Sequence, residues 1–234
     1  MALYRYQKDL PKNRHRWSPL AIFLIIIGLG LLANVFLPIF LYQAKRSSFS
    51  RAMISPLPET KVVLGADSLA TDYTKPDNWF PTAPKFVPFP SRITHYNLSI
   101  PKLKIENAVV EIDGDDLTQS LIHYPGTALP GQSGNAVIFG HSVLPQFFNP
   151  QNYKTIFSTL PELDEGDEIL VEFDGVLYYY QVIKMTEILP QDISILSQYD
   201  DAEYLTLITC VPPGTYLRRL AVKAKLVPFY FSER

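Results

Sequence analysis

One thiol, one imidazole and one guanidinium in this sequence have the residue types and spacing of a nucleophilic site. The only cysteine, Cys210, ends the run Thr-Leu-Ile-Thr-Cys, Arg219 follows in the next apolar segment, and His141 ends an apolar run upstream. A thiol is an effective nucleophile only as its thiolate, which requires a nearby base or positive charge. The sequence therefore predicts a cysteine nucleophile, provided that the fold brings His141 and an arginine to Cys210.

Strands are the elements that must position these residues. Short apolar runs separated by turn residues fill the chain beyond Ile93, and Asp174-Gly175 between two of them indicates a hairpin. Helical patterning is confined to 115–122 and 153–160. Many strands without strand–helix alternation predict a closed or nearly closed, antiparallel-rich barrel. The predicted strands lie within 98–105, 108–112, 136–139, 169–173, 176–183, 205–208 and 217–226.

The predicted strand after Cys210 offers two arginines. A short turn, 211–215, leads into it, and the strand carries both Arg218 and Arg219. Side chains alternate between the two faces of a strand, so only one of them faces the thiol. We expect Arg219 to do so, with Arg218 as the alternative. Gly140 lets the chain turn, so that the imidazole of His141 emerges at a barrel rim.

The five residues that end at Cys210 resemble the TLxTC signature of the sortases, membrane-anchored cysteine transpeptidases of bacterial cell surfaces. Residues 130–142 resemble the segment that carries the histidine of that family, 100–105 its opening strand and 219–222 its arginine strand. The likeness covers about residues 93–228. It implies a mainly β fold, a closed eight-stranded sortase-type barrel with short helices.

The resemblance also implies roles for four residues. Cys210 would be the nucleophile, His141 the general acid or base, and Arg219 the group that stabilises the substrate carbonyl and oxyanion. Thr209 would help to position the substrate or its oxyanion. These expectations agree with the physical roles of a thiolate, an imidazole and a fixed positive charge in acyl transfer.

The implied substrates are peptides and amines. Sortases cleave an LPxTG-like sorting signal through a thioester acyl-enzyme and join its threonine to an amino group. The expected partners are therefore a sorting-signal peptide of a surface protein and an amine acceptor on a peptidoglycan precursor or a pilin. The short, stiff turn after Cys210 favours the housekeeping-like or pilin-type groups over those with long insertions. The overall likeness is to class C or D sortases.

An uncharged apolar run from Leu20 to Leu41 is long enough to cross a hydrocarbon core about 30 Å thick. A cleaved signal peptide would have a shorter apolar stretch ending in a small-residue cleavage site. We expect one transmembrane helix within 18–43, after a basic cytoplasmic arm, 1–17. The protein would then be a single-pass protein of a bacterial cell membrane, with its N-terminus cytoplasmic and its catalytic domain extracellular.

Residues 44–92 are rich in Ser, Thr and Pro and are predicted to form an extracellular stalk or lid. Their aromatic patch, Asp77 to Phe80, is either an anchor that holds the stalk to the domain surface or a lid over the cleft. A lid with Asp77 near the catalytic arginine is typical of pilin-type sortases. The domain itself is expected at 93–228, followed by a short tail, 229–234.

Composition excludes several kinds of function. A net charge of −2 argues against nucleic acid as a partner, and a single cysteine excludes an intramolecular disulfide. No Cys/His cluster has zinc spacing, and the acidic run 111–116 lacks the ligand spacing of an EF-hand. We therefore expect no cofactor and no required metal. His123 is expected to be structural or to line the cleft.

Two other functions fit part of the sequence: a different cysteine enzyme and a non-catalytic binding protein. An L,D-transpeptidase is another surface cysteine enzyme, but its Ser-His-Gly-x-Cys arrangement is missing. A membrane-tethered β-domain that binds a surface protein without catalysis would carry the five-residue motif by coincidence. Substitution of Cys210 and His141 discriminates between a catalytic and a binding protein.

Overall fold

The computed structural model describes residues 18–45, 71–83 and 92–228. The chain divides into two compact units between Leu37 and Pro38, and the helix and the barrel are described separately. The predicted arm 1–17, the predicted tail 229–234 and most of the predicted stalk lie outside the described residues.

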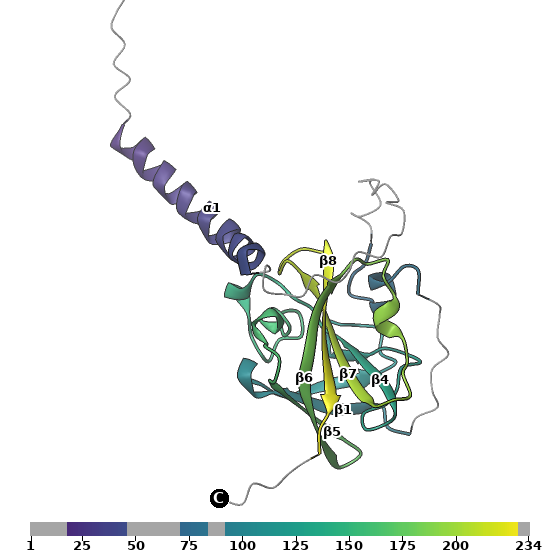
Figure 1. Ribbon diagram of the computed structural model, residues 1–234. Coiled ribbons are helices and arrows are strands. Elements are labelled where there is room, and N and C mark those ends of the chain that lie inside the picture. The colour runs from purple at the N-terminus through teal and green to yellow at the C-terminus, as the bar shows by residue number, and fades with distance from the viewer. Residues whose placement is uncertain (1–17, 46–70, 84–91, 229–234) are drawn as a thin grey trace, which may run out of the picture. The chain divides into compact units, whose positions relative to one another are not determined.

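Helix α1, Pro19–Lys45, forms where the sequence predicted a membrane span (Figure 1). Its segment Pro19–Ala44 is the one described helix that is long and apolar enough to cross a membrane. Pro38 lies inside the helix. Such a proline is tolerated in membrane helices because other groups can satisfy the backbone carbonyl that it leaves free. The helix is thus compatible with a single-pass anchor.

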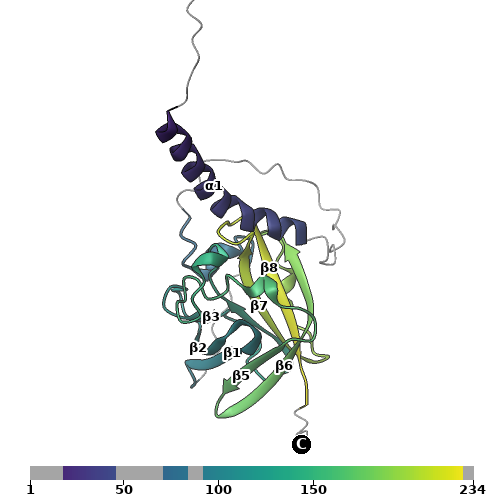
Figure 2. The ribbon, with the colours of Figure 1, turned by 90° about the vertical axis from the view of Figure 1, so that its left-hand side faces the viewer.

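The catalytic candidates belong to a closed barrel of eight strands in the order β1-β2-β3-β4-β7-β8-β6-β5 (Figures 1 and 2). Pairing of β1 with β5 closes the barrel. The β2–β3 and β4–β7 pairs are parallel, whereas the other pairs are antiparallel. The predicted fold class is confirmed. The strands are β1 His95–Ile100, β2 Ile105–Ile112, β3 Leu121–His123, β4 Gly134–Phe139, β5 Glu168–Phe173, β6 Val176–Ile188, β7 Glu203–Val211 and β8 Arg218–Leu226.

Within the described residues 71–83 and 92–228, helical structure is limited to single 3₁₀ turns, and two helical expectations are wrong. Residues 115–122 form turns and the start of β3, and 153–160 form turns that lead into the next 3₁₀ helix. All three residues of β3 are buried, so this strand is too short and too apolar to show alternation. The 3₁₀ helices are η3 Pro76–Trp79, η4 Pro101–Leu103, η5 Pro145–Phe147, η6 Leu160–Glu162 and η7 Ser194–Leu196.

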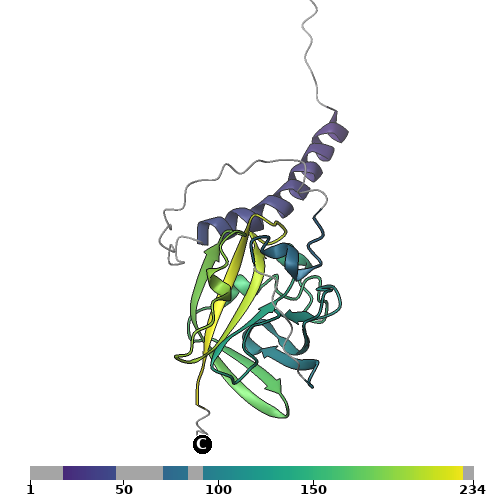
Figure 3. The ribbon, with the colours of Figure 1, turned by 90° about the vertical axis from the view of Figure 1, so that its right-hand side faces the viewer.

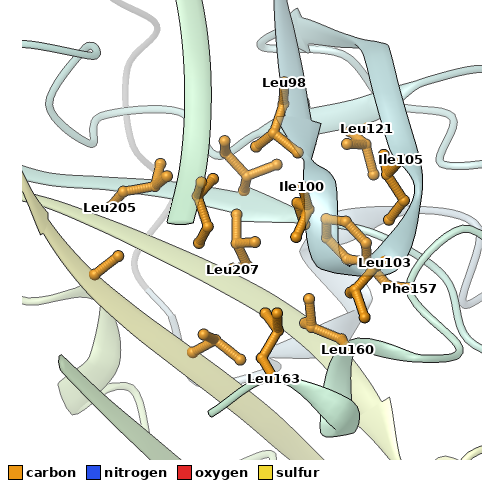
Figure 4. Packing of buried hydrophobic residues seen from close by; sticks show 14 of the residues in the cluster. Leu98, Ile100, Leu103, Ile105, Leu121, Phe157, Leu160, Leu163, Leu205 and Leu207 are labelled. Atoms are coloured by element: carbon orange, nitrogen blue, oxygen red, sulfur yellow. The ribbon is translucent and has the colours of Figure 1, made fainter. Parts of the chain in front are cut away.

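Alternate side chains of the strands fill the barrel interior (Figure 4). Leu98 and Leu207 are fully buried there, and Phe157 and Leu160 join them from the connection between β4 and β5. Burial of each such side chain contributes about 1.5–3 kcal/mol. The barrel is therefore a packed scaffold whose rim can hold catalytic groups in place.

A second apolar cluster lies on the outer face of β4 and β7. Ile208 and Cys210, which alternate with the interior residues of β7, belong to it. Trp79 and Phe80 join the cluster from the segment 71–83, and their exposed fractions are 0% and 1%. Every residue of β4 is consequently buried, because the strand has apolar neighbours on both faces. Cys210 thus lies on a face that the segment 71–83 covers.

Candidate active site

Parallel pairing of β4 with β7 brings the strand ends that carry His141 and Cys210 to the same rim of the barrel. The aligned pairs end at Phe139 and Ile208, and the backbone N–H of Gly140 donates to the Ile208 carbonyl over 3.1 Å. Both strands run in the same direction, so the residues that follow these positions emerge at the same rim. The predicted convergence of the imidazole and the thiol therefore has a structural basis.

Two side-chain hydroxyls join the ends of these strands. The Thr209 hydroxyl donates to the Gly140 carbonyl over 2.8 Å, and the Ser142 hydroxyl donates to the Cys210 carbonyl over 2.7 Å. Thr209 is fully buried. Its hydroxyl is thus engaged with the residue before His141, and the substrate contact expected for Thr209 stays a prediction.

The register of β7 and β8 distinguishes the two arginines. Cys210 lies opposite Arg219, whereas Arg218 lies opposite Val211. Directly opposite residues of an antiparallel pair share a face, so Arg219 is on the thiol's side of the sheet. Its side chain is 1% exposed. The structure thus brings Arg219, rather than Arg218, together with Cys210.

The guanidinium of Arg219 is held by backbone carbonyls. It donates through Nη1 to Tyr216 over 3.1 Å and to Arg218 over 3.2 Å, and through Nη2 to Trp79 over 3.2 Å. Its Nε has no hydrogen-bond partner. No acidic side chain forms an ion pair with Arg219 within the described parts of the chain. A buried cation with this arrangement keeps donor capacity for an additional oxygen.

Segment 71–83 packs over these groups through its aromatic residues. The indole ring of Trp79 lies 5.8 Å from the His141 ring, centre to centre, and the guanidinium of Arg219 lies 5.3 Å from the Trp79 ring centre. The Trp79 indole donates to the Tyr73 carbonyl over 2.8 Å, which closes the segment on itself. Trp79 therefore contacts two of the predicted catalytic groups and shares an apolar cluster with the third.

Two further contacts fasten the segment to the barrel. Tyr73 stacks on Tyr216 of the β7–β8 loop with ring centres 4.3 Å apart, and Leu117 donates its N–H to the Thr74 carbonyl over 2.9 Å. Figure 3 shows the segment, in blue, at the same end of the barrel as that yellow loop. Asp77 is exposed, and the contact with Arg219 considered for it is made instead by the Trp79 carbonyl.

Burial under segment 71–83 keeps the Cys210 thiol in its neutral form. Burial raises the pKa of Cys210 from its ordinary value of 9.0 to about 11, and the positive charge of Arg219 opposes this only in part. The side chain is 1% exposed. In this arrangement, therefore, the thiolate is a very small fraction of the population at neutral pH.

Burial also lowers the pKa of His141 below its ordinary value of 6.5. The carboxylates of Asp116 and Asp72 oppose this shift, and Lys154 adds to it. The imidazole is thus neutral at neutral pH. A neutral thiol beside a neutral imidazole is the resting state that the closed arrangement favours.

The remaining polar candidates have structural partners. Asp116 accepts hydrogen bonds from the backbone and the hydroxyl of Thr118, within a turn. His123 is buried, with its Nδ1 2.8 Å from the Tyr96 hydroxyl and its Nε2 3.1 Å from the Thr127 hydroxyl. No group of three or more metal-ligating side chains occurs within 18–45, 71–83 and 92–228.

Sequence reasoning missed three residues near the site. The Ser142 contact with Cys210 and the effect of Asp72 and Asp116 on His141 were not predicted. For the Ser142 contact, the sequence offered one signal, a hydroxyl-bearing residue directly after the predicted histidine. No sequence signal marks the two aspartates, because they reach His141 from a loop and from segment 71–83.

Comparison with protein families gives a match to the sortase domain over residues 98–227. Sortase D of Bacillus subtilis is 30% identical over 116 residues, which are 49% of this chain and 53% of that protein. The chain thus spans about half the length of this curated relative. The matched region contains all eight strands except the beginning of β1.

Solved structures show the same fold. A sortase D5 transpeptidase of Clostridium perfringens is 26% identical, with a TM-score of 0.50, over 58% of this chain and 79% of that one. A lid mutant of sortase C1 of Streptococcus agalactiae is 25% identical, with a TM-score of 0.51, over 59% of this chain and 71% of that one. The neighbours therefore include class C and class D proteins.

Proposed function

The chain belongs to the sortase family, and from this premise we propose that it is a cysteine transpeptidase acting on LPxTG-like sorting signals. Cys210 is the nucleophile, His141 the general acid and base, and Arg219 the group that stabilises the oxyanion. The observation that carries this assignment is the register that sets Arg219 opposite Cys210 on neighbouring strands, at the rim where His141 emerges.

Acylation begins when the Cys210 sulfur, its proton taken up by His141, attacks the carbonyl carbon of the threonine. The carbonyl oxygen gains a negative charge, which the guanidinium of Arg219 stabilises. The carbon–nitrogen bond to glycine then breaks, and His141 returns its proton to the departing amine. The product is a thioester between Cys210 and the threonine.

Transfer reverses these steps with a second amine. His141 removes a proton from the acceptor amine as its nitrogen attacks the thioester carbonyl. The carbon–sulfur bond breaks, an amide forms and the thiol is regenerated. Water replaces the amine in the hydrolytic side reaction. The acceptor is an amino group on a peptidoglycan precursor or on a pilin.

Segment 71–83 acts as a lid over the site. In the closed arrangement, Arg219 already donates to a backbone carbonyl, that of Trp79, which is the same chemical group as the scissile carbonyl of a peptide. Trp79 and Phe80 fill the apolar outer face of β4 and β7, where the apolar part of a sorting signal would bind. The lid must therefore leave before a peptide enters. The lid mutant described for the Streptococcus agalactiae relative supports this proposal.

Helix α1 anchors the enzyme in the membrane of a bacterial cell. The basic residues of the arm before it favour a cytoplasmic N-terminus, which places the barrel outside. Surface proteins and wall precursors are accessible there. Residues 44–92 then provide both the tether and the lid.

The test uses the full chain in detergent, incubated with a library of LPxTG-like peptides and candidate amines. We expect mass spectrometry to detect a thioester on Cys210 and a peptide joined to one amine. Cys210→Ala and His141→Ala should each abolish both products while leaving a folded barrel. His95→Ala, which changes an exposed histidine at the start of β1, is the matched control and should remain active.

Either of two results would overturn the proposal. Product formation by Cys210→Ala would exclude the thiol as nucleophile. If sorting-signal peptides bound but were not cleaved with any of the acceptor amines, the chain would be a non-catalytic binding domain.

A further inference from the structure

We propose that the hydroxyls of Ser142 and Thr209 form a clamp that sets the separation between His141 and Cys210. We call this pair the hydroxyl clamp. The inference rests on the proposed function, in which a proton passes between the imidazole and the thiol. It assigns both residues as positioning residues, because neither hydroxyl has to touch the substrate.

The clamp lies beyond the end of the backbone ladder. Strand β4 ends at Phe139, and just beyond it the backbone N–H of Gly140 donates to the Ile208 carbonyl of β7. His141 follows this point, so its position relative to β7 depends on other groups. Backbone pairing alone therefore does not fix the imidazole beside the thiol.

The two hydroxyls connect the strands on either side of His141. Thr209, next to Cys210, donates to the carbonyl of Gly140, the residue before His141. Ser142, the residue after His141, donates to the carbonyl of Cys210 itself. One hydroxyl comes from each strand end, so the two bonds run in opposite directions. This crossed arrangement restrains both translation and rotation of the two catalytic residues.

The other backbone groups of this loop bind elsewhere. The His141 carbonyl accepts from the N–H of Phe157 over 3.0 Å, and the N–H of Val143 donates to the Ser158 hydroxyl over 2.9 Å. Both bonds tie the loop to 157–158 rather than to β7. Beyond the backbone bond from Gly140 to Ile208, the hydroxyl clamp is what couples the imidazole-bearing loop to the thiol-bearing strand.

Small displacements at this position have large kinetic effects. Proton transfer requires heavy atoms within hydrogen-bond reach, and a misplacement of about 1 Å lowers a rate by about 100-fold. Loss of one hydroxyl leaves one crossing bond, so each single variant should retain part of the activity. Loss of both removes the crossing bonds, so the two substitutions should not act independently.

The test compares single-turnover thioester formation in the full chain. We expect Ser142→Ala and Thr209→Val each to lower the rate by about 10-fold or more, with rescue by Ser142→Thr and Thr209→Ser. The pH profile of kcat/KM should also shift in the alanine and valine variants, because the coupling of the imidazole to the thiol changes. A structural role alone would leave that profile unmoved.

Thr206→Val is the matched control. Thr206 is a fully buried residue of β7 whose hydroxyl also crosses to β4, where it donates to Asn135 over 2.7 Å. Its loss should lower the melting temperature, while the rate per folded molecule and the pH profile stay those of the parent chain.

Two results would overturn the clamp: parental rates and profiles in Ser142→Ala and Thr209→Val, or an equal rate loss in Thr206→Val. Failure of the proposed function is recognised separately, since thioester formation would then not depend on Cys210 or His141.

Discussion

Arg219 donates a hydrogen bond to the backbone carbonyl of Trp79, with 3.2 Å between Nη2 and the oxygen. The guanidinium also lies against the Trp79 ring, 5.3 Å from its centre. One residue of the covering segment thus engages the buried cation both through its backbone and through its side chain. Because Cys210 lies opposite Arg219, the same contacts keep the thiol away from water.

Trp79→Ala should make the thiol more reactive. Loss of the indole exposes Cys210, so its pKa should fall from about 11 towards its ordinary value of 9.0. The thiolate population at neutral pH then rises by about 10- to 100-fold, and labelling by a thiol reagent should accelerate accordingly. Labelling rates measured across a pH series report both the pKa of Cys210 and its thiolate population. Leu177→Ala, in the exposed β5–β6 hairpin, is the control. Equal labelling rates in the parent chain, Trp79→Ala and Leu177→Ala would contradict the shielding of Cys210 by Trp79.

Arg219→Lys should lower the rate of thioester formation by about 100-fold or more, the magnitude found when an oxyanion donor is removed. A lysine retains the charge but cannot reproduce a planar group that donates to three backbone carbonyls at once. Arg218→Lys is the matched comparison and should be close to the parent chain. A larger loss of rate in Arg218→Lys would mean that Arg218, rather than Arg219, faces Cys210 during catalysis.

His123 should make the barrel less stable in acid. Burial lowers its pKa from an ordinary 6.5 to about 4. The unfolded chain therefore takes up a proton on His123 below pH 6.5, whereas the folded chain resists it until about pH 4, so stability falls as the pH falls through this window. The total loss is about 3 kcal/mol.

Denaturant unfolding of the full chain at several pH values measures this effect. His123→Gln should flatten the pH dependence between 4 and 6.5, even if it lowers stability throughout. His95→Gln, which changes an exposed histidine, should retain the parental dependence. An unchanged slope in His123→Gln would show that other groups cause the acid sensitivity.

Gly140→Ala should lower both stability and activity. A Cβ at this position would collide with the Phe157 ring and would lie 2.7 Å from Leu121 Cδ2. Overpacking of this kind costs about 1–3 kcal/mol, and the displaced backbone carries His141 with it. Thermal unfolding and single-turnover rates provide the measurement. Gly28→Ala is the control, because the added methyl would meet no atom within 4 Å other than the neighbouring backbone of its own helix.

The sequence was sufficient to predict the barrel and the identity of its catalytic candidates. Short apolar runs on either side of the Asp174-Gly175 hairpin located β5 and β6, and the motif that ends at Cys210 located β7. β3 was not predicted, because a buried three-residue strand shows no period. Local patterns thus located the longer strands, whereas the shortest one depends on its neighbours.

The packing of segment 71–83 over the site was harder to predict from the sequence. The aromatic patch around Trp79 was recognised, but its burial depends on surfaces supplied by β4, β7 and the β7–β8 loop. The crossing bonds of Ser142 and Thr209 likewise exist only because β4 and β7 are aligned in parallel. Such contacts join residues that are distant in sequence, and no spacing rule within one segment reveals them.

The burial of Cys210 under Trp79 also bears on chemical survival. Peroxides oxidise the exposed thiolate form of a cysteine, first to a sulfenic acid and then irreversibly. A neutral thiol that is 1% exposed escapes this chemistry. At the proposed extracellular location no cytoplasmic reductant restores a damaged thiol, so burial under segment 71–83 protects the only sulfhydryl of the chain.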